Sequence, residues 1–116
     1  MVDVEEVLRT YAQGERGAGL KYDGGKPRWV LLMQGCHAAL LRVVEMLTFG
    51  AKKYRAHSWQ EVENGQERYR DALYRHMNAY ESGELTDPES GLPHLAHVAT
   101  NALFMLELEE RKNAKP

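Results

Sequence analysis

The chain has 116 residues, a formal net charge of −2 at pH 7 and a hydrophobic fraction of 43%. This length suits one domain with a modest core, and the composition is that of a globular protein rather than a disordered one. A general nucleic-acid-binding protein would carry a strongly positive net charge, so we expect no nucleic acid as a partner. The single cysteine, Cys36, excludes an internal disulfide and a cysteine-rich zinc site.

Hydropathy predicts no membrane partner. The sequence contains no run of about 18 consecutive apolar residues, which a transmembrane helix would require. Residues 1–15 lack the basic and then apolar pattern of a signal peptide. We therefore expect a cytoplasmic protein.

The charge is distributed unevenly along the chain. Residues 1–15 carry a net charge of −3, residues 16–75 carry +5 and residues 76–116 carry −4. A basic middle segment between acidic ends predicts a local anion site, for example for a small phosphorylated ligand. The alternative is that these charges only form solvated surface.

We expect a single domain over residues 1–116 with three parts: an N-terminal helix (1–14), a glycine-rich loop (15–36) and a helical core (37–111). Asp3 and Glu6 form a capping signature, and the apolar residues that follow have helical spacing. After this helix glycines are dense and the helical period is lost, which predicts the loop.

Three helices are predicted in the core, at about 37–54, 66–82 and 94–111, because apolar residues recur there at helical spacing. Ser90 is the expected cap of the last helix, with Pro93 in its opening turn. No segment alternates with period two over five residues, so the predicted fold class is all-α with about four helices. The last helix is apolar around most of its circumference, which predicts a homo-oligomer that completes the core.

The most specific motif is Lys21-Tyr22-Asp23-Gly24-Gly25-Lys26-Pro27-Arg28-Trp29. Its glycines allow the backbone to approach a ligand, and its basic side chains suit a nucleotide phosphate. The candidate ligand-binding residues here are Lys21, Asp23, Lys26 and Arg28. The motif is not a P-loop, because Leu20 and Pro27 stand where that pattern needs glycine and serine or threonine. The alternative is a flexible turn with solvated lysines.

A second basic and aromatic group follows the first core helix. It consists of Lys52, Lys53, Tyr54 and Trp59, and Arg75 with His76 on the next helix extends the set of candidate phosphate-binding residues. Lysines in a last helical turn also complement the helix dipole without binding any ligand, so that explanation stays open.

Histidines form the third feature. His94, His97 and Asn101 lie on one line of the last helix and make a polar stripe on an otherwise apolar element. We expect both histidines to be neutral at pH 7, because they lie near the positive end of the helix. A divalent metal site could be assembled from Asp87, Glu89, His94 and His97, with His76 nearby. The alternative is that these are core histidines satisfied by hydrogen bonds.

Four stretches in this order resemble one known family. They are Lys21–Pro27, Leu47–Tyr54 followed by Trp59, Arg75-His76, and Asp87–His97 followed by Asn101. They resemble the phage and bacterial domain named for the amino-terminal part of dATP/dGTP diphosphohydrolase, which is grouped with the MazG-like all-α nucleotide pyrophosphohydrolases. The likeness covers roughly residues 19–108. It implies an oligomeric MazG-like helical bundle in the cytoplasm, or the host cytoplasm for a phage protein, and a purine nucleotide ligand.

The resemblance also implies hydrolysis of dGTP or dATP to the monophosphate and pyrophosphate, with Mg²⁺ or Mn²⁺ as the metal. MazG-like enzymes resemble one another in an E-E-x-x-E helix that faces an E-x-x-D helix. The corresponding helices here offer Arg75-His76 and His94 to His97 instead. Besides a purely structural helical oligomer, two functions therefore stay open, and no catalytic residue is assigned. One is hydrolysis; the other is non-catalytic sequestration of a nucleotide second messenger, such as a cyclic or ADP-ribose-derived signal, in phage counter-defence.

Overall fold

A computed structural model describes residues 3–5 and 21–114, and the chain divides into two compact units, residues 1–35 and 36–116. The elements are the helices α2 (Trp29–Gly35), α3 (His37–Lys53), α4 (Gly65–Glu81) and α5 (His94–Ala114), and the 3-10 helix η1 (Ser58–Glu61). Within the described ranges the only β-type pairing is an isolated bridge between Thr86 and Pro93. The all-α prediction is therefore confirmed.

The described part of the first unit holds a turn and α2. The N–H of Lys26 donates to the carbonyl of Asp23 at 3.2 Å, and Gly25 takes the positive φ of 80° that this turn requires. Residues 29–35 form α2, although their sequence was predicted to belong to the glycine-rich loop, so that loop is shorter than predicted. The run of Val, Leu and Met in this stretch has ordinary to good helix propensity, but it is too short to show a period.

The predicted N-terminal helix falls mostly outside the described residues. At its start, Oδ1 of Asp3 accepts a hydrogen bond from the N–H of Glu5 at 3.0 Å. This contact is of the kind expected from a capping aspartate.

The three predicted core helices are confirmed, with α3, α4 and α5 beginning within one residue of the predicted positions. The end of α5 lies three residues beyond the predicted end at 111. Arg111 bonds Glu107 one turn back at 2.6 Å and Oε1 of Gln60 at 2.8 Å, which holds the last turns of α5 against η1.

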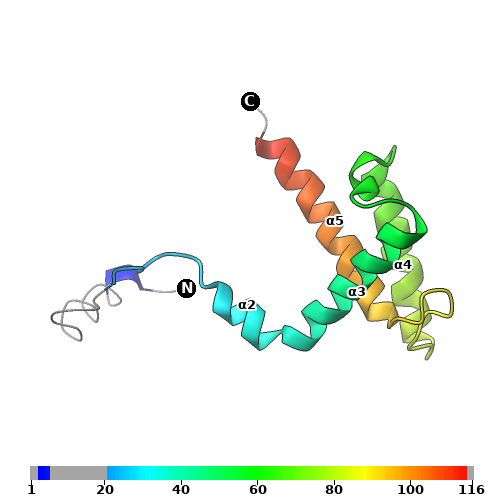
Figure 1. Ribbon diagram of the computed structural model, residues 1–116, viewed down its shortest axis with the longest axis horizontal. Helices are drawn as coiled ribbons and strands as arrows, with labels where there is room; N and C mark the ends of the chain where they lie inside the picture. The colour runs from blue at the N-terminus through cyan, green and yellow to red at the C-terminus, as the bar shows by residue number, and fades with distance from the viewer. Residues whose placement is uncertain (1–2, 6–20, 115–116) are drawn as a thin grey trace. The chain divides into compact units, whose positions relative to one another are not determined.

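In the second unit α4 lies alongside α5, α3 packs against α5, and η1 contacts both α4 and α5 (Figure 1). An aromatic cluster fixes η1. The rings of Trp59 and Phe104 stack with centroids 4.2 Å apart, and the Tyr69 ring lies 5.1 Å from Phe104. The Tyr69 hydroxyl also donates to the carbonyl of Trp59. Helix α5 therefore anchors the segment that connects α3 to α4.

Apolar surface remains exposed on this unit. Ala96 is the one buried hydrophobic residue within the described ranges, whereas Val44 on α3 and Leu103 and Leu106 on α5 are about half exposed. None of the described helices alone is long and apolar enough to span a membrane; α2 and α3 would meet that criterion only together.

We expect the exposed apolar faces to be covered by a second copy of this chain. Sedimentation velocity over a hundredfold range of protein concentration measures this association. The expected result is a mass of at least two chains that falls on dilution. A single species of 13.2 kDa throughout would contradict it.

Phe104→Ala should lower the free energy of unfolding by about 2 kcal/mol, because it removes the ring on which Trp59 stacks and leaves a cavity. Urea titration followed by tryptophan fluorescence measures the change. Glu110→Ala, at an exposed position of the same helix, is the matched control and should change it by less than about 0.5 kcal/mol. Equal effects of the two substitutions would contradict a structural role for the stack.

Candidate functional site

An open groove of about 1010 Å³ is lined by the C-terminal half of α3, the segment through η1, and the facing sides of α4 and α5. Its basic lining residues are Lys53, Arg55, Arg68, Arg75 and Arg111, and its acidic ones are Asp87, Glu89 and Glu107. Cations therefore outnumber carboxylates in the groove. This excess of positive charge suits an anionic ligand.

The basic residues differ in whether they already have a partner. The ion pairs are Lys53 with Glu89, Arg55 with Glu61 at 2.7 Å, and Arg111 with Glu107 at 2.6 Å. Arg68 and Arg75 form no ion pair or hydrogen bond with any residue that the structure describes. Because they are seven residues apart on α4, they lie on one face of that helix, two turns from each other. These two guanidinium groups can contact a ligand without losing an existing partner.

The turn between α4 and α5 is held by its own backbone. The N–H of Asp87 donates to the carbonyl of Leu92 at 2.8 Å, and the N–H of His94 donates to the carbonyl of Leu85 at 2.9 Å. Gly91 supplies the positive φ of 73° that closes this turn. These bonds place the side chain of Asp87 over the first turn of α5.

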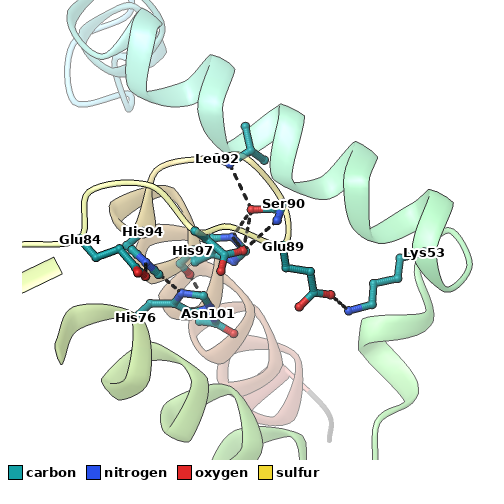
Figure 2. Close-up of polar contacts among 10 residues, drawn as sticks. Lys53, His76, Glu84, Glu89, Ser90, Leu92, His94, His97 and Asn101 are labelled. Carbon is teal, nitrogen blue, oxygen red and sulfur yellow. Dashed lines mark hydrogen bonds and ion pairs between the residues drawn. The ribbon is translucent and has the colours of Figure 1, made fainter. Parts of the chain in front are cut away.

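Ser90 does not cap α5 as the sequence predicts. The carbonyl of Pro93 accepts the first helical bond, from the N–H of Ala96 at 2.9 Å. The Ser90 hydroxyl instead donates to Oδ2 of Asp87 at 2.8 Å and bonds Nε2 of His97 at 2.7 Å (Figure 2). Its role is therefore to link the turn to the second turn of α5.

This arrangement of serine, histidine and aspartate is not a catalytic triad. In a triad the aspartate and the serine occupy opposite nitrogens of the imidazole. Here Oδ2 of Asp87 lies 3.2 Å from Nε2 of His97, the same nitrogen that bonds Ser90. The three groups therefore hold one another in place, and the geometry does not activate Ser90 as a nucleophile.

A second chain of contacts runs through His76 and His94. Their Nδ1 atoms are 2.8 Å apart, and Nε2 of His94 lies 2.6 Å from Oε1 of Glu84 (Figure 2). A carboxylate can only accept, so Nε2 of His94 carries a hydrogen, and with one hydrogen on each ring Nδ1 of His94 accepts from His76. Nε2 of His76 has no hydrogen-bond partner among the residues described, and His76 lines the groove. This nitrogen can therefore contact a ligand.

Burial sets the protonation of this cluster. Burial, together with the nearby His97, lowers the pKa of His76 to about 4. Burial likewise lowers the pKa of His97 in spite of the adjacent Asp87, which agrees in direction with the expectation of a neutral ring. Burial alone would raise the pKa of Asp87, but the hydrogen bonds from Ser90 lower it overall. At neutral pH the site thus presents two uncharged imidazoles beside an ionised carboxylate.

The residues predicted to bind phosphate separate into three groups. The first group lines the groove and consists of Lys53, Tyr54, Trp59, Arg75 and His76. Lys52 is exposed outside it, although it is adjacent to Lys53. Lys21, Asp23, Lys26 and Arg28 belong to the first compact unit and not to the unit that holds the groove.

Trp59 has a different setting from the one expected for a base-stacking residue. One face of its ring packs against Phe104, and the Arg111 guanidinium lies 5.9 Å from the ring centroid. Tyr54 is 70% exposed and lines the groove, so its ring is the more accessible aromatic surface.

Two of the four predicted metal ligands meet in the structure. Asp87 and His94 lie together with His76, and one ligand atom of each falls within 4.8 Å of the others. Of the other two, Glu89 pairs with Lys53, and His97 bonds Ser90. This three-residue group contains one carboxylate and two imidazoles, which differs from the all-oxygen set that Mg²⁺ prefers.

Three residues at the site were not predicted. Arg68 could have been found from its position seven residues before Arg75 on the same helix face. Glu84 could not, because its contact with His94 depends on the path of the turn. Thr100 is 4% exposed, and its hydroxyl is a buried polar group without a hydrogen-bond partner within the described ranges. It lines the groove, where a ligand could satisfy it.

Lowering the pH from 7 to 4.5 should destabilise the metal-free protein. Because the pKa of His76 is about 4 in the folded state and near 6.5 in the unfolded chain, the unfolded chain binds more protons as the pH falls between these values. We expect this histidine to account for about 1–2 kcal/mol, after a reduction for its partial exposure. Urea titrations in EDTA at several pH values measure the loss, and His76→Gln should reduce it. An identical pH dependence in that variant would contradict the assignment.

Similarity to known proteins identifies the family of this chain. Residues 16–115 match the sequence model of the family described as "dATP/dGTP diphosphohydrolase, N-terminal". A Salmonella phage PMBT28 protein named dATP/dGTP diphosphohydrolase is 34% identical over 90 residues, which cover 78% of this chain and 29% of that relative. The matched region is thus less than a third of the relative, and no solved structure matches the chain. The family match spans most of the sequence, so the chain belongs to the dATP/dGTP diphosphohydrolase N-terminal family.

Proposed function

We propose that the chain binds a purine deoxynucleoside triphosphate, dGTP or dATP, in the groove and hydrolyses it to the monophosphate and pyrophosphate. The observation that carries this proposal is the unpaired Arg75 beside the open Nε2 of His76, in a groove with more cations than carboxylates. The name of the phage relative supports the substrate class.

The groove has the size and charge for such a ligand. Small-molecule sites occupy about 300–1,000 Å³, so a volume of about 1010 Å³ accommodates a nucleotide. Arg68 and Arg75 are separated by about 10 Å along α4, which lets them contact different parts of one extended ligand. Arginine is suited to phosphate because its planar group can donate two parallel hydrogen bonds.

Different side chains of the groove suit different parts of the nucleotide. Lys53 and Arg75 lie with the histidine cluster, and we place the phosphates there. The exposed ring of Tyr54 provides a surface on which a base can stack. The unsatisfied hydroxyl of Thr100 offers a further hydrogen bond to the ligand.

In the proposed reaction a water oxygen bonds to the α-phosphorus, and the bond from that phosphorus to the bridging oxygen of the β-phosphate breaks. Negative charge grows on the departing pyrophosphate. Arg75 and Lys53 can stabilise this charge, and stabilisation of developing charge is the main way proteins accelerate phosphoryl transfer. A proton of the attacking water passes to the solvent in the same step.

Hydrolysis is tested by incubating the protein with dGTP or dATP in the presence of Mg²⁺ or Mn²⁺ and separating the products by chromatography. We expect the monophosphate and pyrophosphate in equal amounts. In parallel, the protein is recovered and heated to release any bound nucleotide. Intact dGTP or dATP as the only released species, with no products, would contradict hydrolysis and favour sequestration.

Substitution of Arg75 should weaken nucleotide binding. We expect Arg75→Ala to raise the Kd for dGTP by about 10- to 150-fold, which corresponds to the loss of a charge-assisted hydrogen bond worth about 1.5–3 kcal/mol. Arg70→Ala is the matched control, because Arg70 is an exposed arginine of α4 outside the groove. Lys53→Ala and Lys52→Ala form a second pair of the same kind. Calorimetric titration measures each Kd. Equal changes in Kd for the two variants of a pair would contradict binding of the phosphates at Arg75 or Lys53.

A further inference from the structure

We propose that His76, Asp87 and His94 form a binding site for a divalent transition-metal ion such as Zn²⁺. One ligand atom from each residue lies within 4.8 Å of the other two. The three residues come from α4, from the turn and from the start of α5, so the site exists only in the folded unit.

The donor set selects the class of metal. Two imidazole nitrogens and one carboxylate oxygen are ligands that Zn²⁺ and neighbouring first-row ions bind well. Mg²⁺ prefers oxygen ligands in octahedral geometry, and this group offers it one carboxylate. The donor set therefore disfavours Mg²⁺, one of the two ions that the family resemblance implies.

The groups behind the three ligands already hold them in place. Glu84 lies 2.6 Å from Nε2 of His94, which leaves Nδ1 of His94 as the ligand nitrogen. Metal-bound histidines commonly donate their second N–H to a carboxylate in this manner. Asp87 receives two hydrogen bonds from Ser90 at Oδ2. Its Oδ1 has no donor among the described residues and can face the ion.

Binding requires a small movement of the two rings. The Nδ1 atoms of His76 and His94 are 2.8 Å apart, whereas two nitrogens bound to one Zn²⁺ at about 2.1 Å are about 3.0–3.4 Å apart. Small rotations of the side chains open this gap. The ion then replaces the hydrogen that the rings share, and His76 carries its hydrogen on Nε2. Since His76 and Asp87 line the groove, the ion is accessible from that side.

The first experiment uses the full chain without nucleotide. After treatment with EDTA and its removal, the protein is titrated with ZnCl₂ or MgCl₂ by calorimetry. We expect one Zn²⁺ per chain with a Kd below about 10 μM and a rise in Tm of several degrees. We expect no saturable binding of Mg²⁺ below about 1 mM. The absence of stoichiometric Zn²⁺ binding to the wild-type chain would overturn the proposal.

A second measurement identifies the ligand atoms in the wild-type chain. Long-range ¹H–¹⁵N spectra of the imidazoles should show that Nδ1 of both His76 and His94 changes on addition of Zn²⁺. Unchanged signals of both rings in the presence of bound Zn²⁺ would show that the ion binds elsewhere and would overturn the proposal. This readout does not depend on whether any variant folds.

Variants give the contribution of each group. His76→Asn and Asp87→Asn should each raise the Kd for Zn²⁺ at least tenfold, and Glu84→Gln should raise it about 10- to 100-fold through the orientation of His94. The Glu84 side chain is 55% exposed, so this substitution carries little risk to folding. His57→Asn is the control. His57 lines the groove outside the cluster, and asparagine tolerates its positive φ of 65°. Equal affinities in all variants would overturn the proposal.

The metal titration is independent of the proposed hydrolysis. A chain that binds Zn²⁺ at this site but leaves dGTP and dATP intact would contradict the proposed function alone. A chain that hydrolyses nucleotide with Mg²⁺ and binds no Zn²⁺ would contradict only the metal site.

Discussion

The hydrogen-bonded turn between α4 and α5 determines most of the candidate site. Its backbone bonds, from Asp87 to Leu92 and from His94 to Leu85, fix where the chain reverses and where α5 begins. Because of that register, the first turns of α5 meet the C-terminal half of α4 with histidines rather than apolar residues. The same turn carries the carboxylate that lies between them. A shift of the turn by one residue would rotate α5 by about 100° and separate the two histidine pairs.

This end of the helix pair has a polar interior. Its buried polar residues are His94, His97, Thr100 and Asn101, and only Ala96 among the described hydrophobic residues is equally buried. Burying polar groups is unfavourable unless they are hydrogen-bonded, and apolar side chains of similar size would stabilise the helix pair more simply. The aromatic cluster of Trp59, Tyr69 and Phe104 provides the apolar packing at the other end. The aromatic packing and the histidine cluster thus occupy different ends of the same two helices, and residues of both line the groove.

The sequence was sufficient to predict the core helices, because their apolar residues repeat over four turns or more. It was insufficient for α2, which is too short for a period to be seen. The spacing of His94 and His97 also showed that a polar face was present. The contact from Glu84 to His94 could not be predicted, since the two residues are ten positions apart and only the folded path of the turn brings them together. The basic motif from Lys21 to Arg28 and the groove belong to different compact units, a division that composition could not reveal.

The stacking of His76 on His97 limits how the cluster takes up protons. The ring centroids are 4.0 Å apart and the planes differ by 12°. Two positive charges at about 4 Å repel each other by about 1 kcal/mol in water and by more in a partly buried site. The first proton bound by either ring therefore makes the second harder to bind. Protonation of the two rings is thus coupled, and each step belongs to both residues together.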